Sequence, residues 1–157
     1  MVGMKYVFWA CRLLMIWNSD RIGAEGSGFK QIMHGMNAER ILLAGEAIGL
    51  GFAALRHASL YAANRVVFGR PIGQNQGIAH PLAAAWTKLE STRLMIMQAA
   101  RMYDEGFATG EYANAVKYLA GENAFSACET AVLTLGGMGY AKEFVMMSGE
   151  VVSVLTG

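Results

Sequence analysis

Asn64-Arg65-Val66-Val67-Phe68-Gly69-Arg70-Pro71-Ile72-Gly73-Gln74-Asn75-Gln76 joins two long segments that have helical patterns of apolar residues. Gly69 allows the backbone to turn, because a residue without a Cβ adopts positive φ at little cost. Pro71 cannot continue a helix, and it favours an extended backbone at Arg70. The stretch therefore predicts a turn between two helices, with the side chains of Arg65 and Phe68 carried on it.

Apolar residues recur at spacings of three and four in three segments, as is typical of amphipathic helices. We expect helices at roughly 29–66, 79–105 and 111–135. Their expected buried stripes are Ile41, Ala44, Ile48, Phe52, Leu55, Ala58 and Ala62, then Leu82, Trp86, Leu89, Ile96, Ala99 and Tyr103, then Ala113, Val116, Ala120, Ala124, Ala127 and Ala131. Short connections between these helices predict the all-α fold class, as an up-down antiparallel helical bundle.

Glycine and proline mark the expected ends and weak points of these helices. Pro81 suits the first position of a helix, so we expect the second helix to open at His80-Pro81. Gly45, Gly49 and Gly51 would each destabilise an isolated first helix by roughly 1 kcal/mol relative to Ala. Close approach by a neighbouring helix or a ligand is the expected compensation for these three glycines.

The C-terminal part of the sequence predicts one further element. Three glycines in Gly136-Gly137-Met138-Gly139 end the third helix, and a fourth helix is expected to begin near Lys142. The chain reaches Gly157 too soon for this helix to be a full partner. We therefore expect a bundle whose last helix is truncated.

Composition narrows the class of protein. The chain has 157 residues, enough for one domain with a sizeable core, and 13 basic against 12 acidic residues. No basic run is present, which disfavours nucleic acid as a partner. Cys11 and Cys128 lie in no CxxC motif, so neither a metal site nor a disulfide framework is predicted.

The apolar run from Tyr6 to Trp17 is interrupted by Arg12 and is too short to span a bilayer. No small-x-small cleavage site follows it, as a signal peptide would require. We therefore expect a strand or an ill-ordered lead-in here, with no stable membrane insertion. A cytoplasmic location is the corresponding expectation.

Four motifs in register resemble the C-terminal helical domain of acyl-CoA dehydrogenases. They are I-G-x-E-G-x-G-F at Ile22–Phe29, Asn37-Ala38-Glu39-Arg40, R-x-x-F-G at Arg65–Gly69, and G-G-x-G-Y at Gly136–Tyr140. The resemblance implies an FAD-dependent enzyme that oxidises acyl-CoA thioesters to enoyl-CoA and passes electrons to electron-transfer flavoprotein. It also implies a homo-oligomer in which FAD is held between two subunits.

The same resemblance implies a division of the chain. Residues 1–28 would be a lead-in and the remnant of a linker from a missing β-domain, because residues 1–20 do not resemble that domain's usual final strand. Residues 29–144 would form the helical-bundle domain, and residues 145–157 an atypical tail. A fragment of this kind is expected to be inactive on its own, because the parts that enclose flavin and substrate are absent.

Residue by residue, the resemblance assigns a cofactor-binding set. Arg65 would contact the flavin diphosphate, for which the planar donor fork of arginine is well suited. Phe68 would pack near the adenosine half and Gln76 would hydrogen-bond there. Gly136 and Gly137 match the turn that closely approaches the cofactor of a partner subunit. Leu133 departs from the family pattern, in which most members have Gln.

Glu39 is the predicted catalytic base. The reaction needs one carboxylate within reach of the α-proton. Many relatives place this glutamate in a C-terminal E-G-T segment that this chain lacks, whereas the isovaleryl-CoA and long-chain members carry it directly before an Arg, as in Glu39-Arg40. Asn37 and Arg40 would contact the acyl-CoA. The alternatives are a first-turn glutamate that interacts with the helix dipole and, for Arg40, a surface ion pair.

A second class of function stays open on the sequence. The chain could be a non-enzymatic helical bundle that binds another protein through its Gly- and Ala-rich faces, or a truncated gene product. Flavin absorbance in the purified protein separates these alternatives from a dehydrogenase.

Overall fold

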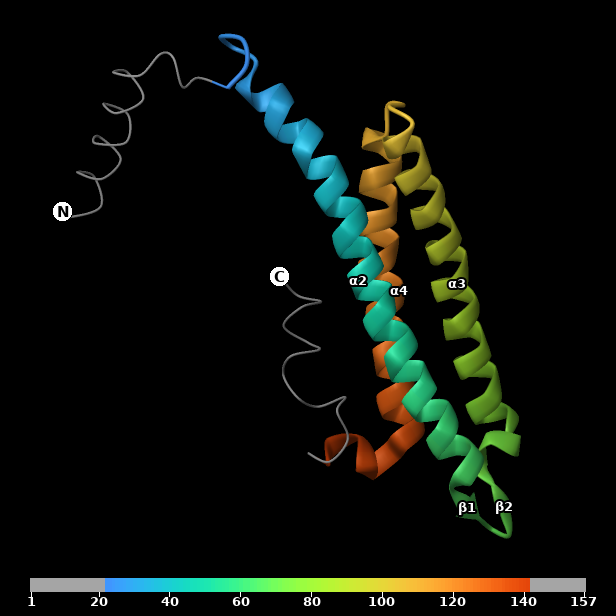
Figure 1. Ribbon diagram of the computed structural model, residues 1–157. Helices are drawn as coiled ribbons and strands as arrows, with labels where there is room; N and C mark the ends of the chain where they lie inside the picture. Colours follow the sequence, from blue (N-terminus) through green and yellow to red (C-terminus); the bar gives the residue numbers. More distant parts are fainter. Residues whose placement is uncertain (1–21, 142–157) are drawn as a thin grey trace, which may run out of the picture. The chain divides into compact units, whose positions relative to one another are not determined.

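The computed structural model describes residues 22–141 (Figure 1). The chain divides into two compact units, Met1–Gly35 and Met36–Gly157. In the first unit, the Ser27 Oγ donates to the Ala24 carbonyl at 2.6 Å and accepts from Gln31 Nε2 at 2.8 Å. These bonds fix the start of helix α2 (Gly28–Asn64). The predicted lead-in at 1–20, the fourth helix near Lys142 and the tail lie outside the described residues.

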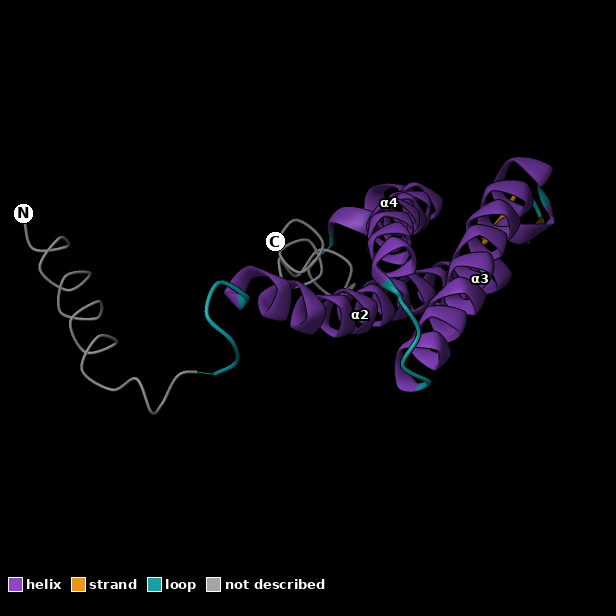
Figure 2. Ribbon diagram, turned by 90° about the horizontal axis from the view of Figure 1, so that it is seen from above, coloured by secondary structure: helices purple, strands orange, loops and turns teal. Residues whose placement is uncertain are grey.

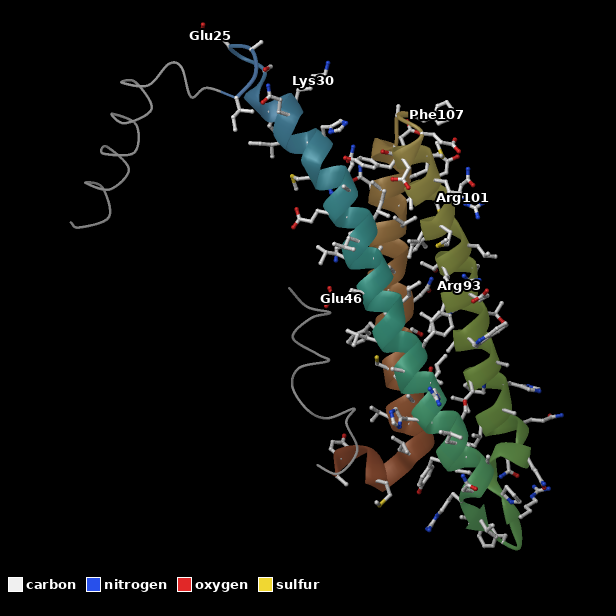
Figure 3. All side chains as sticks on the ribbon, viewed as in Figure 1. Glu25, Lys30, Glu46, Arg93, Arg101 and Phe107 are labelled. Carbon is white, nitrogen blue, oxygen red and sulfur yellow. The ribbon has the colours of Figure 1, made fainter. Side chains whose placement is uncertain are left out.

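The second unit confirms the all-α bundle with up-down antiparallel helices (Figures 1 and 2). After α2 the chain forms a short antiparallel hairpin from β1 (Val66–Val67) and β2 (Arg70–Pro71), followed by the 3₁₀ turn η2 (Ile72–Gln74). Helices α3 (Gln76–Asp104) and α4 (Gly110–Leu135) come next, and η3 (Gly136–Tyr140) ends the described part. Charged side chains such as Glu46 and Arg101 lie on outward faces (Figure 3).

All three helices contribute to one close-packed core. The six predicted positions of α4 are fully buried at 0% exposure: Ala113, Val116, Ala120, Ala124, Ala127 and Ala131. Small side chains on α4 let the other helices approach closely. A Cβ added to Gly51 would lie 3.1 Å from the Leu89 methyl carbons and 3.3 Å from the Ala124 Cα. Gly51 therefore has the predicted helix neighbour.

Gly45 and Gly49 have no such helix neighbour among the described residues. A Cβ at either position would meet nothing within 4 Å in the described structure. Their faces point to open space on the outer side of α2, where Leu42 is 74% exposed. Packing among residues 22–141 therefore does not explain these two glycines.

Two helix ends differ from the expected ones by a few residues, and the expected place of Pro81 is wrong. The first helix stops at Asn64 rather than near residue 66, because Val66 and Val67 pair with Pro71 and Arg70 across the hairpin. The second helix begins at Gln76, and Pro81 lies inside it rather than at its first position. A proline this close to the N-terminus removes one hydrogen bond, to the Gly77 carbonyl four residues back, and the helix tolerates that loss.

One predicted core residue is also wrong. Trp86 is 54% exposed, and the buried line of α3 runs instead through Ala85, Leu89 and Thr92. Thr92 is 2% exposed, and its hydroxyl accepts a 2.8 Å hydrogen bond from Asn123 Nδ2 of α4. It donates to the Lys88 carbonyl as well, so this buried polar residue is satisfied on both sides.

Helix α2 is long and apolar enough, by length and composition alone, to cross a membrane. Core helices of soluble proteins pass the same test. In α2 the apolar residues that face α3 and α4 are buried, among them Ile41, Ile48 and Leu55. Packing in the bundle therefore accounts for a large part of its apolar composition.

Candidate functional site

The β1–β2 hairpin presents an aromatic side chain in an unusual backbone conformation. Val66 pairs with Pro71 and Val67 with Arg70, which leaves Phe68 and Gly69 as a two-residue loop. Both have positive φ, 53° and 79°, as a type I′ turn requires. Positive φ is uncommon for a bulky residue. Phe68 is nevertheless held there with its side chain fully exposed, at 102%.

Arg65 and Gln76 flank the hairpin on its two sides. The Arg65 amide donates to the Tyr61 carbonyl at 2.8 Å, and its carbonyl accepts from the Ile72 amide at 2.9 Å. The backbone of Arg65 is thus fixed while its side chain stays exposed. Gln76 is exposed as the first residue of α3. The structure therefore brings together, at one end of the bundle, the three residues predicted to hold the dinucleotide.

This end of the bundle has basic residues without acidic neighbours in sequence. No Asp or Glu occurs between Glu46 and Glu90, a stretch that includes Arg56, Arg65 and Arg70. Within residues 22–141, neither Arg65 nor Arg70 forms an ion pair. Unpaired guanidinium groups of this kind suit an anionic ligand.

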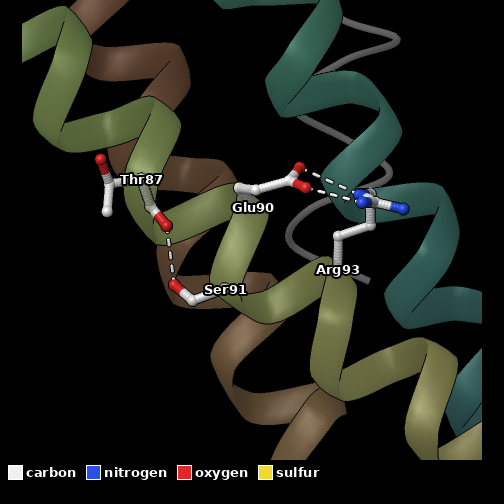
Figure 4. A network of polar contacts seen from close by, with 4 residues as sticks. All are labelled: Thr87, Glu90, Ser91 and Arg93. Atoms are coloured by element: carbon white, nitrogen blue, oxygen red, sulfur yellow. Dashed lines mark hydrogen bonds and ion pairs between the residues drawn. The ribbon is translucent and has the colours of Figure 1, made fainter.

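Arg93 on α3 shows the contrasting case (Figure 4). Its guanidinium donates to both carboxylate oxygens of Glu90, at 2.9 and 2.6 Å. These hydrogen bonds lower the pKa of the Glu90 carboxyl. The charge of Arg93 is therefore paired with a carboxylate of its own helix, whereas the charge of Arg65 is not paired within residues 22–141.

The hairpin also contains a contact that the motif did not indicate. Arg70 Nη2 donates to the Asn75 Oδ1 at 2.6 Å, which joins β2 to the first turn of α3. Asn75 is the N-cap residue of α3, yet its side chain makes no capping hydrogen bond. Only the turn geometry brings these two side chains together, so their spacing in the sequence did not predict this hydrogen bond.

The predicted base and substrate residues lie near the other end of the second unit. Arg40 Nη1 donates to the Asn37 Oδ1 at 3.4 Å, as expected for residues three apart on a helix. Glu39 is exposed. Successive residues of a helix point about 100° apart, so Glu39 and the Asn37–Arg40 pair occupy different faces of α2.

Glu39 and the hairpin are far apart in one chain. From Glu39 to the end of α2 at Asn64 there are 25 residue steps, which correspond to about 38 Å of helix. This length exceeds that of a flavin dinucleotide. Glu39 and Arg65 of the same chain therefore cannot contact one cofactor molecule.

Gly136 and Gly137 end α4 at the same end of the bundle as the hairpin. This follows from the antiparallel arrangement and from the packing of Leu135 in a cluster with Ala58. Gly136 has φ of 58°, so glycine is needed there for the backbone itself. Nothing lies within 4 Å of a Cβ added to either glycine. The exposed backbone is accessible from outside the chain, and so is the Leu133 side chain, which is 73% exposed.

Two open pockets lie along the groove between α2 and α3. The first, of about 420 Å³, is lined by Ser59, Ala62, Ala63, Pro71, Gly73, Gln74, Ala79 and Leu82. The second, of about 440 Å³, is lined by Phe52, Leu55, Arg56, Ser59, Leu82, Ala83 and Trp86. Neither lining includes a residue predicted to bind the cofactor or the substrate. Trp86, expected in the core, is instead part of this groove.

The residues at the hairpin fit the group that the motifs imply. Arg65 offers an unpaired cation for a diphosphate, Phe68 an exposed ring for a nucleoside, and Gln76 an exposed amide. These side chains would contact a ligand from one side only, since all of them are exposed. Further walls of such a site would come from outside residues 22–141.

Comparisons with known proteins agree on one family. Residues 26–149 match the family model "Acyl-CoA dehydrogenase, C-terminal domain". The chain is 42% identical over 125 residues to acyl-CoA dehydrogenase FadE12 of Mycobacterium tuberculosis, covering 78% of this chain and 32% of that protein. The chain thus spans about a third of the length of this relative.

Solved structures give the same result. The butyryl-CoA dehydrogenase of Megasphaera elsdenii superposes with a TM-score of 0.80 and 32% identity, covering 85% of this chain and 34% of that one. A structure described as the FAD complex of PigA has a TM-score of 0.79 and 28% identity, covering 87% of this chain and 36% of that one.

Proposed function

This chain belongs to the acyl-CoA dehydrogenase family, and from this premise we propose that it serves an FAD-dependent, cytoplasmic acyl-CoA dehydrogenase. The reaction is the α,β-dehydrogenation of an acyl-CoA thioester to enoyl-CoA, with electron-transfer flavoprotein as the electron acceptor. FAD, when bound, supplies the site that accepts hydride from the β-carbon. The residues of this chain bind the cofactor and the substrate and remove the α-proton.

The single observation that carries the proposal is the hairpin. Phe68 is fully exposed at positive φ, beside an exposed Arg65 that has no ion pair within residues 22–141. An aromatic ring in a strained conformation with no partner among the described residues indicates a partner outside them. The diphosphate and the adenosine half of FAD match the two side chains, and Gln76 adds a hydrogen-bonding amide.

The separation of Glu39 from the hairpin supports a site shared between two copies. About 38 Å of helix lies between them, so each flavin would meet Glu39 of one copy and Arg65 of another. Gly136 and Gly137, with open space in front of their backbone, would approach the same cofactor as Arg65. A homo-oligomer is therefore part of the proposal.

Glu39 is the proposed α-proton base, and Asn37 and Arg40 are the proposed acyl-CoA contacts. Glu39 is exposed in the described structure, as a base that meets a substrate from outside its own helix has to be. The Asn37–Arg40 hydrogen bond at 3.4 Å holds the two other side chains side by side. Their donors could bind the polar part of a thioester ligand.

The test is a comparison of Arg65→Gln and Glu39→Gln in the purified protein. Arg65→Gln is expected to weaken FAD binding roughly tenfold to a hundredfold, the usual range for a lost charged hydrogen bond. Arg101→Gln, an exposed arginine on α3 outside the site, is the matched control and should bind FAD normally. Unchanged FAD affinity of Arg65→Gln would contradict the flavin contact.

Glu39→Gln should bind FAD normally, because its side chain lies far from the hairpin of its own chain. In an assembly that reduces flavin with acyl-CoA, its rate should fall by roughly 10² to 10⁴, the usual contribution of a general base. Stopped-flow measurement of flavin bleaching gives this rate directly. A near-normal rate would assign proton abstraction to another residue.

An interaction module without enzymatic activity is the second candidate. Exposed apolar side chains on α2 and α4 favour it, namely Leu42, Leu60, Phe125 and Leu133. Such side chains are also expected where subunits meet, so the exposed apolar side chains alone do not separate the two functions. A purified protein that never takes up FAD, at any concentration at which it self-associates, would favour the interaction module.

A further inference from the structure

We infer that Arg70 is a second cation for the flavin diphosphate and that Asn75 is the residue that positions it. This inference rests on the proposed function, because the ligand is the same. It adds two residues that the motif did not single out. The evidence is the register of the hairpin, the Arg70–Asn75 hydrogen bond and the charges around it.

The register places Arg70 on the same face of the hairpin as Arg65. Val67 and Arg70 are cross-strand partners, so their side chains share a face. The Ile72 amide donates to the Arg65 carbonyl at 2.9 Å, which continues the hairpin pairing one residue beyond β1, so Arg65, two residues before Val67, projects to that face as well. Diagonal neighbours of this kind have Cα atoms about 7–8 Å apart, which long arginine side chains can bridge to meet one diphosphate.

Asn75 holds the Arg70 guanidinium in place. Its Oδ1 accepts from Arg70 Nη2 at 2.6 Å, and its own backbone is fixed by hydrogen bonds with Ile72, Ile78 and Ala79. Asparagine at an N-cap ordinarily accepts a bond from a backbone N–H of the first helical turn. Here the side chain forgoes that bond and contacts Arg70 instead. The geometry therefore favours a fixed arginine over a capped helix.

The held guanidinium keeps most of its binding capacity. Arginine has five N–H donors, and one bond to a neutral amide leaves the charge and four donors for a ligand. Within the described residues no carboxylate pairs with Arg70, in contrast to Arg93, whose fork is occupied by Glu90. Arg65 and Arg70 together match the two negative phosphates of a dinucleotide, whereas Arg65 alone leaves one phosphate without a cation.

The first test follows the arginine side chains directly. Nε–Hε signals of the purified protein are recorded by NMR during titration with FAD, ADP, inorganic pyrophosphate and riboflavin, which has no phosphate. The signals of Arg65 and Arg70 should move with the first three compounds and stay in place with riboflavin. The Arg93 signal is the internal control and should stay in place throughout.

Variants give a second readout. Arg70→Gln should raise the Kd for ADP roughly tenfold and flatten its salt dependence, as expected when one cation is lost. Asn75→Asp is the decisive variant, because aspartate is an equally good N-cap and keeps the bond to Arg70. Its added negative charge should weaken ADP binding about as much as Arg70→Gln while thermal stability is retained. Asn75→Ala removes the bond to Arg70 without adding a charge and should also weaken ADP binding, so normal ADP binding by Asn75→Ala would refute the positioning role of Asn75.

The outcomes separate this inference from the proposed function. If Arg65 responds to the phosphates while Arg70 does not, and Arg70→Gln binds ADP normally, the second cation is refuted and the flavin contact stands. If neither arginine responds to any phosphate compound, the flavin contact itself is refuted, and the role of Arg70 with it.

Discussion

Gly51 and Gly69 show that glycine serves two different purposes in this chain. At Gly51 a side chain would fit only tightly, because the Leu89 methyl carbons and the Ala124 Cα lie 3.1 and 3.3 Å from the position of a Cβ. At Gly69 there is room on every side, since nothing lies within 4 Å, but φ is +79°. The first glycine is required by packing between helices and the second by the shape of the hairpin.

The neighbours of the two glycines differ in the same way. Leu89 and Ala124, which lie against Gly51, are both fully buried at 0% exposure. Beside Gly69, Phe68 is exposed at 102% and has φ of 53°. Contacts among the described residues explain the side chains near Gly51, whereas they do not explain Phe68. This difference locates the candidate site at the hairpin rather than in the bundle core.

The largest expected effect is on the core side of this comparison. Leu89→Ala removes a fully buried side chain that contacts Gly51 and should lower the free energy of unfolding by about 2–5 kcal/mol. For a chain of this length that corresponds to a fall in Tm of roughly 4–20 °C. Thermal denaturation followed by circular dichroism measures it.

Leu94→Ala is the matched control on the same helix. Leu94 is 58% exposed, so its truncation should change the free energy of unfolding by no more than about 0.5 kcal/mol. Equal losses for the two variants would mean that Leu89 is not part of a well-packed core, and the contrast with the hairpin would fail.

Much of this core was predictable from the sequence. Alanines of α4 recur at three and four residues, and a long stripe of this kind has only one way to be buried. The position of Trp86 was not predictable, because two neighbouring lines on α3 have helical spacing and the larger apolar residue lies on the exposed one. The line of α3 that faces α4 is the one whose side chains are small enough to fit there. Ala85 and Thr92 belong to that line.

The candidate site was predictable only in part. The turn chemistry of the motif predicts a turn at Gly69, a break of the helix at Pro71 and an exposed Phe68 on the turn. The strand pairing and the Arg70–Asn75 bond do not, because they depend on backbone angles that several turn types could have satisfied. Pairings of this kind emerge only when the turn and the first turn of α3 are placed together.

A smaller effect is expected on the hairpin side. Gly69→Ala meets no steric contact, yet an L-residue at φ of +79° is strained by about 1–2 kcal/mol. Gly77→Ala in α3 is the control, because its Cβ also meets open space but its φ is not positive. That change should stabilise the chain by roughly 0.4–1 kcal/mol. Urea denaturation distinguishes the opposite signs, and a stabilised Gly69→Ala would refute the positive-φ turn.

Phe68→Asn is expected to have the smallest effect on stability. It also separates the hairpin most sharply from the bundle core around Gly51. Asparagine tolerates positive φ, and Asn-Gly is the preferred pair for a type I′ turn. The variant should therefore be more stable than the parent chain, by up to about 1 kcal/mol, although it removes a large apolar side chain. FAD affinity should fall roughly twofold to tenfold, because an aromatic contact is lost.

Phe107→Asn is the control for this trade of stability against binding. Phe107 is 59% exposed in the connection between α3 and α4 and has no positive φ (Figure 3). Its replacement should neither stabilise the chain nor change FAD binding. A Phe68→Asn variant that is destabilised would show that the ring packs within its own chain. One that is stabilised but binds FAD normally would leave the strained phenylalanine without the role proposed for it.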